Sequence, residues 1–375
     1  MADRIGHKLY TKLEVRPVIN AGGSTTRWGG STPSPAVKEA MDEADESWVE
    51  LEELLDKSGA YIADLLGVEA AYVTAGCYAA LVLSTAACLT GKDREKVERL
   101  PDTTGMANEI VLQKPQRYGF DRCYTLSGGK LVEAGDEDGC SPEQLEEALG
   151  PDTAALAYYV QPEGSNVVSL EDAVRIAHEK GVPVIVDAAS RIYPLDYFRG
   201  MAQSADLVCF GGKYISAPQS TGFVCGRKDL VEAVVMHGFV SARPFGRGQK
   251  LDRQEIVGLV VGLDEWLSMD HEARFSEYDE TFARIQKGLE GASHVRATKV
   301  VRSGRHPGVS LHVVLDSEGL GKSAQEVSDE LYAGNPRIRV LHEGGDTINI
   351  NVHTLNEGED EIVAERLRKV LEGTG

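Results

Sequence analysis

The chain has 375 residues, and its 59 Asp and Glu against 39 Lys and Arg give a formal net charge of −20. A chain of this length can form one large domain of about 250 residues and a smaller one. The acidic balance opposes binding to RNA or DNA, because a phosphate backbone requires a local excess of positive charge. We therefore expect a two-domain protein for which nucleic-acid binding is disfavoured and a small-molecule substrate fits better.

The cysteines and histidines give no sign of a disulfide framework or a metal site. No CxxC or CxxH spacing occurs among the six cysteines, and three histidines that stand apart have no second ligand at metal-binding spacing: Cys77, Cys88, Cys123, Cys140, Cys209 and Cys225, and His237, His306 and His342. The N-terminal residues 1–15 lack the apolar core of a signal peptide, and no run of 18 apolar residues occurs. We expect reduced thiols, no bound metal, no membrane span and a cytoplasmic location.

The first elements lead to a glycine turn. Apolar and charged residues recur with helical period from about Pro35 to Leu66, and this predicted helix ends at Gly67. A short strand at 70–73, a turn at 74–77 and an apolar helix follow. Free backbone N–H groups and the positive end of a helix dipole meet at such a turn, so Gly76 and Cys77 form a candidate anion site. The alternative is an ordinary turn, because one glycine is not a fingerprint.

Short apolar strands and helices then alternate. The predicted strands lie within 108–115, 123–135, 154–160, 182–190, 205–213 and 221–228, and the predicted helices within 141–149 and 169–181. This alternation favours an α/β domain with a mainly parallel sheet and helices on both faces. Ligands of such sheets bind at the carboxyl ends of the strands.

The last third of the chain predicts a second, smaller domain. A long helix beginning near Asp252 is followed by strands within 295–301 and 308–316, a helix at 323–334, strands within 338–344 and 346–351, and a helix at 359–373. This order is typical of a compact α+β unit. The expected organisation is an N-terminal arm at 1–34, a large domain at 35–265 and a small C-terminal domain at 266–375.

Asp187 and Lys213 carry the clearest chemical signal. Each closes an apolar run, 182–186 and 207–212 respectively, so both are expected at the carboxyl ends of neighbouring strands. Pyridoxal 5'-phosphate (PLP) chemistry requires such a pair, because the lysine holds the cofactor aldehyde as a Schiff base and the carboxylate keeps the pyridine nitrogen protonated. The alternatives are an aspartate that caps a helix or binds a metal, and a lysine exposed on a loop.

Several segments together resemble the fold-type-I PLP-dependent enzymes, the aspartate aminotransferase superfamily. Within it the chain resembles the selenocysteine synthase-like branch, and there it is most similar to the D-glucosaminate-6-phosphate ammonia-lyase-like proteins. The matching segments are 16–22, 30–35, 74–77, 186–187, 212–213, 218–219, 246–247 and 250–253. The resemblance implies the aspartate aminotransferase-like fold, with a mainly parallel seven-stranded sheet in the large domain and a small α+β C-terminal domain.

The resemblance also implies roles for individual residues. Lys213 would carry the PLP Schiff base, Asp187 would pair with the ring nitrogen, and the backbone of Gly76 and Cys77 would bind the phosphate. Further contacts to the cofactor would come from Gln161, at the ring face or phenolic oxygen, and from Ser216 or Thr221, near the phosphate. Tyr78 and Tyr118 are candidates for stacking on the ring, and packing is an equally good explanation for both.

The implied activity is an α,β-eliminating lyase. A substrate amine would displace Lys213, and the freed lysine would remove the Cα proton. Loss of a β-hydroxyl from an amino-sugar acid or hydroxy amino acid would then give a keto acid and ammonia. Other PLP reactions, such as racemisation, aldol cleavage or transamination, stay open, because the fold does not fix the chemistry.

Seryl-tRNA selenium transfer is disfavoured among the activities of this branch. The core match begins at Arg16, so the extra N-terminal region with which selenocysteine synthase holds tRNA is not expected here. The net charge of −20 also opposes tRNA binding. The resemblance implies a homodimer or a higher homo-oligomer, because active sites of this fold form between two subunits.

An anionic substrate requires cations, and arginine suits carboxylate or phosphate best. Arg243 and Arg247 lie in the glycine- and proline-containing loop 241–248, which fits a mobile clamp, and Arg339 is a third candidate for binding the substrate. The wider set of cations is Arg27, Arg117, Arg122, Lys250, Arg253 and Arg337. For each, a solvated surface group is the alternative.

Overall fold

The computed structural model describes residues 8–161, 165–302, 308–342 and 344–374, so His306 and the first seven residues lie outside it. Two compact units are present. The large unit is Pro33–Ser268, and the small unit combines Met1–Thr32 with Met269–Gly375. The expected division into an N-terminal arm (1–34), a large domain (35–265) and a small domain (266–375) stays a prediction.

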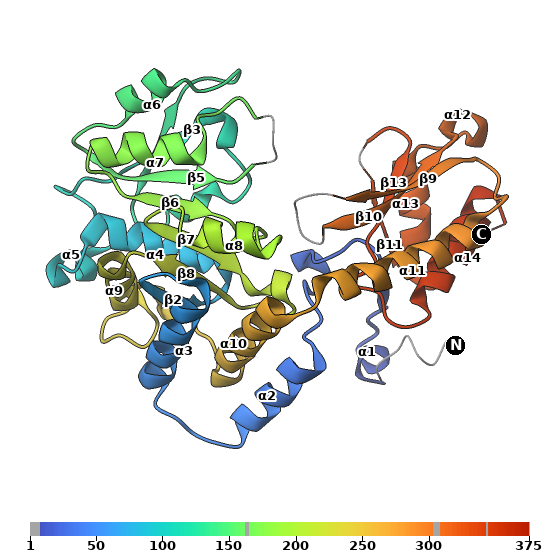
Figure 1. Cartoon of the computed structure of the whole chain (residues 1–375), viewed down its shortest axis with the longest axis horizontal. Helices are drawn as coiled ribbons and strands as arrows, with labels where there is room; N and C mark the ends of the chain where they lie inside the picture. Colours follow the sequence, from blue (N-terminus) through green and yellow to red (C-terminus); the bar gives the residue numbers. More distant parts are fainter. Residues whose placement is uncertain (1–7, 162–164, 303–307, 343, 375) are drawn as a thin grey trace. The chain divides into compact units, whose positions relative to one another are not determined.

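A seven-stranded sheet forms the centre of the large unit, in the order β2-β8-β7-β6-β5-β3-β4 (Figure 1). The strands are β2 (Ala70–Thr74), β3 (Glu109–Gln113), β4 (Lys130–Ala134), β5 (Thr153–Tyr159), β6 (Val184–Asp187), β7 (Leu207–Gly211) and β8 (Gly222–Gly226). Neighbours run parallel from β7 through β6, β5 and β3 to β4, whereas β8 is antiparallel to both β2 and β7. The expected mainly parallel seven-stranded sheet is confirmed.

Helix α4 (Gly76–Thr90) lies against this sheet and is buried along most of its length. It contacts β5, β6, β7 and β8, which explains why its sequence is apolar all round rather than on one stripe. The remaining helices of the large unit are α2 (Pro35–Asp45), α3 (Leu51–Leu66), α5 (Arg94–Arg99), α6 (Pro142–Ala148), α7 (Leu170–Glu179), α8 (Leu195–Ala202), α9 (Lys228–His237) and α10 (Arg253–Ser268). Short 3-10 turns at Lys114–Gln116 (η3), Asp121–Tyr124 (η4), Gly212–Ile215 (η5) and Phe245–Gly248 (η6) complete it.

The continuous helix expected over 35–66 is wrong, because the chain leaves helical conformation between α2 and α3. The guanidinium of Arg253 donates to Ala44 O and Asp45 O, and so satisfies carbonyls that the end of α2 leaves without partners. Trp48 in the connection is 90% exposed, with Arg253 4.4 Å from its ring centroid. The hydrophobic period continues through this break and does not reveal it.

The long helix expected from Asp252 to about 290 is also divided. It consists of α10 and α11 (His271–Leu289), and the two are separated by Met269 and Asp270. The Asp270 side chain accepts from the N–H groups of Glu272 and Ala273, which is a helix N-cap. The break coincides with the boundary of the two units, which lies between Ser268 and Met269.

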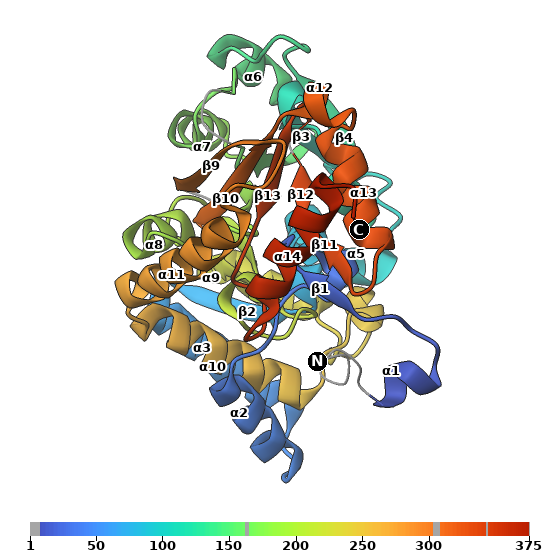
Figure 2. The ribbon, with the colours of Figure 1, turned by 90° about the vertical axis from the view of Figure 1, so that its right-hand side faces the viewer.

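The small unit contains a four-stranded antiparallel sheet in the order β12-β13-β10-β9. Its strands are β9 (Val295–Arg302), β10 (Val309–Leu315), β12 (Leu341–His342) and β13 (Thr347–Ile350), and its larger helices are α11, α13 (Ala324–Ala333) and α14 (Glu359–Leu371). Burial alternates along β10, so one face of this sheet packs against the helices shown in Figure 2. Short helices lie at α1 (Lys8–Lys12), η2 (Thr26–Trp28) and α12 (Ser317–Leu320).

A separate pairing joins the two ends of the chain within the small unit. Strand β1 (Val18–Asn20) pairs in parallel with β11 (Arg337–Arg339), and Thr354 donates to Asn20 O at 2.6 Å. None of the helices within the described residues is long and apolar enough to cross a membrane.

Candidate active site

The strand register gathers the expected chemical groups at one edge of the seven-stranded sheet. Thr74 at the end of β2 pairs with Gly222, which pairs in turn with Gly211 at the end of β7. One strand further, Asp187 at the end of β6 pairs with Cys209. The turn after β2, Asp187 and the segment that carries Lys213 therefore share the carboxyl edge.

The Asp187 carboxylate is 6% exposed and is held by several donors. Its Oδ2 accepts from the Tyr118 hydroxyl at 2.6 Å, and its Oδ1 accepts from Ala189 N at 3.1 Å and faces Cys77 Sγ at 3.6 Å. Burial raises the pKa of this carboxyl, while the hydrogen bonds from Tyr118, Ala189 and Cys77 oppose the rise. A further N–H donor would stabilise the charged form here.

Tyr118 lies beside Asp187 in a stack of aromatic rings. Its ring is parallel to that of Tyr159, with centroids 4.3 Å apart and an interplanar angle of 1°. Tyr159 ends β5 and pairs with Asp187 in the register, so both rings lie at the same edge as the carboxylate. The structure thus brings one of the two stacking candidates to Asp187, whereas the other, Tyr78, is 40% exposed.

Lys213 follows β7 in the 3-10 turn η5 and is partly buried. Its Nζ lies 4.9 Å from the centroid of the Tyr214 ring. Burial lowers the pKa of this ammonium, because the charged form loses solvent, and the neighbouring Cys77 thiol acts in the opposite direction. A lowered pKa raises the fraction of neutral amine, which is the form that attacks an aldehyde or accepts a proton.

The turn before α4 forms a backbone cradle. Helix α4 has no side-chain cap at Ala75, so its first N–H groups are available to a ligand. Gly76 has φ +83°, a conformation that other residues rarely adopt. At Gly222 a Cβ atom would lie 2.7 Å from Cys77 N and 2.6 Å from Gly76 C, so only glycine allows β8 to approach the turn. An uncapped helix start is a binding site for phosphate.

The other predicted cofactor contacts have partners within the protein. The Thr221 hydroxyl donates to Pro218 O at 2.7 Å and is buried, so its proton stabilises the loop after Lys213. Gln161 follows β5, and its Nε2 donates to Pro115 O at 2.6 Å. Ser216 caps η5 with φ +56° and lies in the same loop as Lys213.

Each of the predicted substrate arginines has neighbours within its own unit. Arg243 pairs with Glu98 of α5 at 2.7 Å, and α5 follows the far end of α4. Arg247 donates to Phe239 O at 3.2 Å. Arg339 belongs to the small unit, where its Cζ lies 5.6 Å from the centroid of the Trp28 ring.

Three contacts to Asp187 in the structure were not predicted from the sequence. The hydrogen bond from Ala189 N–H to the Asp187 side chain joins residues two positions apart. Aspartate often accepts such a bond in a turn, so the aspartate in the sequence Asp187-Ala188-Ala189 was a local signal for it. The Tyr118 hydroxyl and the Cys77 thiol come from segments 69 and 110 positions away and have no local signal.

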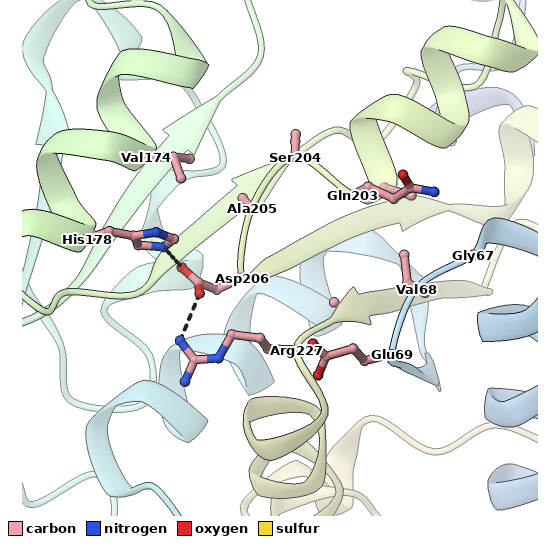
Figure 3. A pocket seen from close by; sticks show the side chains of 12 residues that line it. Gly67, Val68, Glu69, Val174, His178, Gln203, Ser204, Ala205, Asp206 and Arg227 are labelled. Atoms are coloured by element: carbon pink, nitrogen blue, oxygen red, sulfur yellow. Dashed lines mark hydrogen bonds and ion pairs between the residues drawn. The ribbon is translucent and has the colours of Figure 1, made fainter.

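A cavity of about 480 Å³ lies at the opposite edge of the sheet (Figure 3). Asp206, just before β7, is 2% exposed and accepts from His178 Nε2 at 2.8 Å and from Arg227 at 2.9 Å. These bonds satisfy the buried carboxylate, so we interpret the cluster as structural. Over the part of the chain that the structure describes, no three His, Cys, Asp or Glu side chains form a group that suits a metal ion.

Comparison with known proteins identifies the family. Residues 127–243 match the model of the class-V aminotransferases. The chain is 32% identical to a 5'-C-glycyluridine monooxygenase-decarboxylase of Streptomyces sp, over 96% of this chain and 92% of the relative. It is 30% identical to the D-glucosaminate-6-phosphate ammonia lyase of Salmonella typhimurium, over 97% of this chain and 98% of the relative.

This chain belongs to the fold-type-I PLP-dependent enzymes. A solved structure of D-glucosaminate-6-phosphate ammonia-lyase superposes with a TM-score of 0.85 at 28% identity, and covers 98% of this chain and 99% of that one. The L-seryl-tRNA(Sec) selenium transferase of Moorella thermoacetica is more distant, at 26% identity over 69% of this chain and 57% of the relative. The resemblance seen in the sequence, the fold and the PLP cofactor are confirmed.

The geometry of this enzyme fits PLP. An uncapped helix start suits the phosphate, and a lysine with a lowered pKa suits the aldehyde. The buried Asp187 carboxylate already accepts an O–H donor, and a protonated ring nitrogen is a donor of the same kind. These are the three contacts that the cofactor requires.

We predict that Asp187→Asn changes how the stability of the cofactor-free enzyme depends on pH. Because the pKa of Asp187 is raised above 3.8 in the folded state, the folded protein binds this proton more tightly and loses stability as pH rises from 3.8 through the raised pKa. D187N lacks this loss, so its free energy of unfolding relative to the wild type should increase with pH over that window. Urea unfolding at several pH values measures this, with exposed Asp196→Asn as the control, and parallel profiles would contradict it.

Gly222→Ala should weaken cofactor binding, because the new Cβ displaces the Cys77 amide from the phosphate cradle. Loss of one hydrogen bond to a charged group costs about 1.5–3 kcal/mol, which is roughly 10- to 100-fold in the dissociation constant of PLP. Titration with PLP, followed by absorbance, measures the change. Gly200→Ala is the matched control, since its Cβ would meet no atom within 4 Å. Equal affinity in both variants would disprove the cradle.

Proposed function

We propose that this enzyme is a PLP-dependent ammonia lyase that converts a small 2-amino-3-hydroxy acid, of the amino-sugar acid class, to a keto acid and ammonia. The observation that supports this most is the match to D-glucosaminate-6-phosphate ammonia lyase over 97% of this chain and 98% of the relative. The superposition on the ammonia-lyase structure supports the same activity. The positions of Asp187 at the end of β6 and of Lys213 just after β7 support the proposal, because this chemistry uses a carboxylate and an amine.

The catalytic residues in this proposal are Lys213 and Asp187. Lys213 would hold the cofactor through its aldehyde, and its neutral amine would accept the Cα proton of the substrate. The lowered pKa of Lys213 favours this role, because a protonated amine cannot act as a base. Asp187 holds a proton on the ring nitrogen, and the Tyr118 hydroxyl orients the carboxylate. The N–H groups at Gly76 and Cys77 hold the phosphate.

Bound PLP supplies an electron-accepting ring that stabilises the negative charge left at Cα. Transfer of the Cα proton to Lys213 allows the C3 hydroxyl to leave as water. The enamine that remains takes up a proton from solvent at C3, and water hydrolyses the resulting imine at C2, so the net change is loss of ammonia and formation of a 2-keto-3-deoxy acid. The enzyme's contribution is to position the base and to maintain the charge of the ring nitrogen.

The remaining predicted contacts stay proposals. Gln161, Ser216 and Thr221 are assigned to the cofactor, and Arg243, Arg247 and Arg339 to the anionic groups of the substrate. The Arg243–Glu98 pair is exposed, with 73% and 48% of the two side chains accessible, so its loss costs little. Arg243 is therefore able to exchange its carboxylate partner for a substrate anion.

A second candidate is an oxygen-dependent decarboxylation. The relative named 5'-C-glycyluridine monooxygenase-decarboxylase is 32% identical over 96% of this chain, slightly more than the ammonia lyase. Both reactions begin by breaking a bond at Cα, so the same lysine and carboxylate would serve either one. Racemisation, aldol cleavage and transamination share this first step.

We further propose a cytoplasmic homodimer or larger homo-oligomer that does not bind tRNA. The net charge of −20 supports the last point.

Lys213→Ala should lower kcat by roughly 10²–10⁴-fold, which is the usual contribution of a general base. The variant should also lose the visible absorption band of the bound cofactor. Lys180→Ala, a surface lysine paired with Glu146 at 3.0 Å, is the control and should keep both. A K213A variant with wild-type turnover would show that another group accepts the proton.

A substrate panel tests the reaction class. Ammonia and a keto acid should form in equal amounts from a phosphorylated 2-amino-3-hydroxy sugar acid, without consumption of oxygen. Oxygen-dependent release of CO₂ from a glycyl-nucleoside would instead support the second candidate. An amino acid formed from an added keto acid would show transamination.

A further inference from the structure

Three arginines of the small unit gather around two aromatic rings. The Cζ atoms of Arg27 and Arg339 lie 5.3 and 5.6 Å from the centroid of the Trp28 ring. Trp28 packs edge-on against Tyr332 at 5.4 Å, and the Cζ of Arg337 lies 5.2 Å from the Tyr332 centroid. We call these five residues the arginine–aromatic cluster.

The fold builds this cluster from segments about 300 positions apart. Strand β1 pairs with β11 so that Val18 is opposite Arg337 and Asn20 is opposite Arg339. The two arginines are two positions apart on β11, and side chains with that spacing project from the same face of a strand. The chain then passes Gly22, where a Cβ would lie 3.3 Å from Arg339 Cγ, and reaches Arg27 and Trp28 in η2.

The charge of the cluster is not compensated. Among the described residues, Arg27, Arg337 and Arg339 have no carboxylate within 4.0 Å, although the chain has 59 acidic residues and most other arginines of the small unit are paired. In the same part of the structure, Nε of Arg337 and Nε of Arg339 are buried without a hydrogen-bond acceptor.

Aromatic rings attract these cations but do not replace the missing acceptors. A cation–π contact acts on the face of the ring, whereas a guanidinium N–H requires an oxygen in its plane. Buried N–H groups without acceptors and adjacent like charges are both unfavourable. An oxyanion between the arginines would relieve both.

We propose that the arginine–aromatic cluster binds a phosphoryl group. Phosphate carries up to two negative charges and accepts the bidentate fork of arginine, so it matches at least two of the three guanidinium groups. A carboxylate carries one charge and would leave the others uncompensated. The phosphoryl group belongs to a phosphorylated amino-sugar acid, as the proposed function suggests, or to free phosphate, and both have the same chemistry.

The test uses the full-length enzyme loaded with PLP, so that the cofactor's own phosphate site is filled. Inorganic phosphate is titrated while tryptophan fluorescence and heat of binding are recorded. We expect saturable binding, seen as heat and as a change in the emission of Trp28, and the fluorescence change should be absent in Trp28→Phe. Acetate at the same ionic strength should bind at least about tenfold more weakly.

Substitutions locate the site. Arg27→Gln is the first variant because Arg27 is exposed and its replacement does not disturb the core. Arg337→Gln and Arg339→Gln follow. Each should weaken phosphate binding by about tenfold or more. Arg296→Gln, which removes a surface arginine paired with Asp316, is the control and should bind phosphate normally.

The outcomes separate this proposal from the proposed function. A higher KM for the phosphorylated substrate in R337Q, with an unchanged KM for its unphosphorylated analogue, would assign the site to the substrate. Unchanged KM values with weakened phosphate binding would assign it to free phosphate. If no lyase activity is found, phosphate binding still tests the cluster. The proposal would be overturned if phosphate showed no saturable binding, if acetate bound equally well, or if all three variants bound phosphate with the affinity of the wild type.

Discussion

The buried carboxylate of Asp187 is the constraint on which the site depends. Removing a carboxylate from water is costly, and this group is 6% exposed at the carboxyl end of a central strand. Hydrogen bonds from Tyr118 and Ala189 reduce the cost but do not cancel it, because the pKa stays raised. Because the negative charge of Asp187 is still incompletely stabilised, the site favours a ligand that is cationic or donates an N–H group. A protonated pyridine ring, as in PLP, would provide that donor.

The sheet order explains why the other groups meet this carboxylate. Strand β6 has β5 and β7 as parallel neighbours, so Tyr159 and the segment leading to Lys213 are placed at the same edge. Strand β8 runs in the opposite direction and therefore begins where its neighbours end. Gly222 at its start supports the turn at Gly76, and a larger residue would displace that turn. The phosphate cradle thus depends on an antiparallel strand within a mainly parallel sheet.

The sequence predicts those features of the fold that a local pattern of residues specifies. Alternating apolar runs and helices indicate the sheet, and Asp187 and Lys213 stand at the ends of such runs. Buried strands read alike in both directions, so the reversal of β8 has no local signal. The Tyr118 hydroxyl reaches Asp187 across 69 positions, which only the tertiary fold can specify. Helix breaks at Trp48 and Asp270 were missed because caps and exposed connections leave the hydrophobic period intact.

An acidic enzyme that handles anionic ligands has to build its anion sites from geometry rather than from net charge. The start of α4 uses backbone N–H groups, which carry no formal charge and need no acidic partner. Arg243 shows the more common condition of an arginine in this chain, since it forms an exposed ion pair with Glu98. Each arginine on β11 instead lies beside one aromatic ring, Tyr332 for Arg337 and Trp28 for Arg339. A cation–π contact adds no negative charge, so such an arginine keeps its charge available to an anion within a protein of net charge −20.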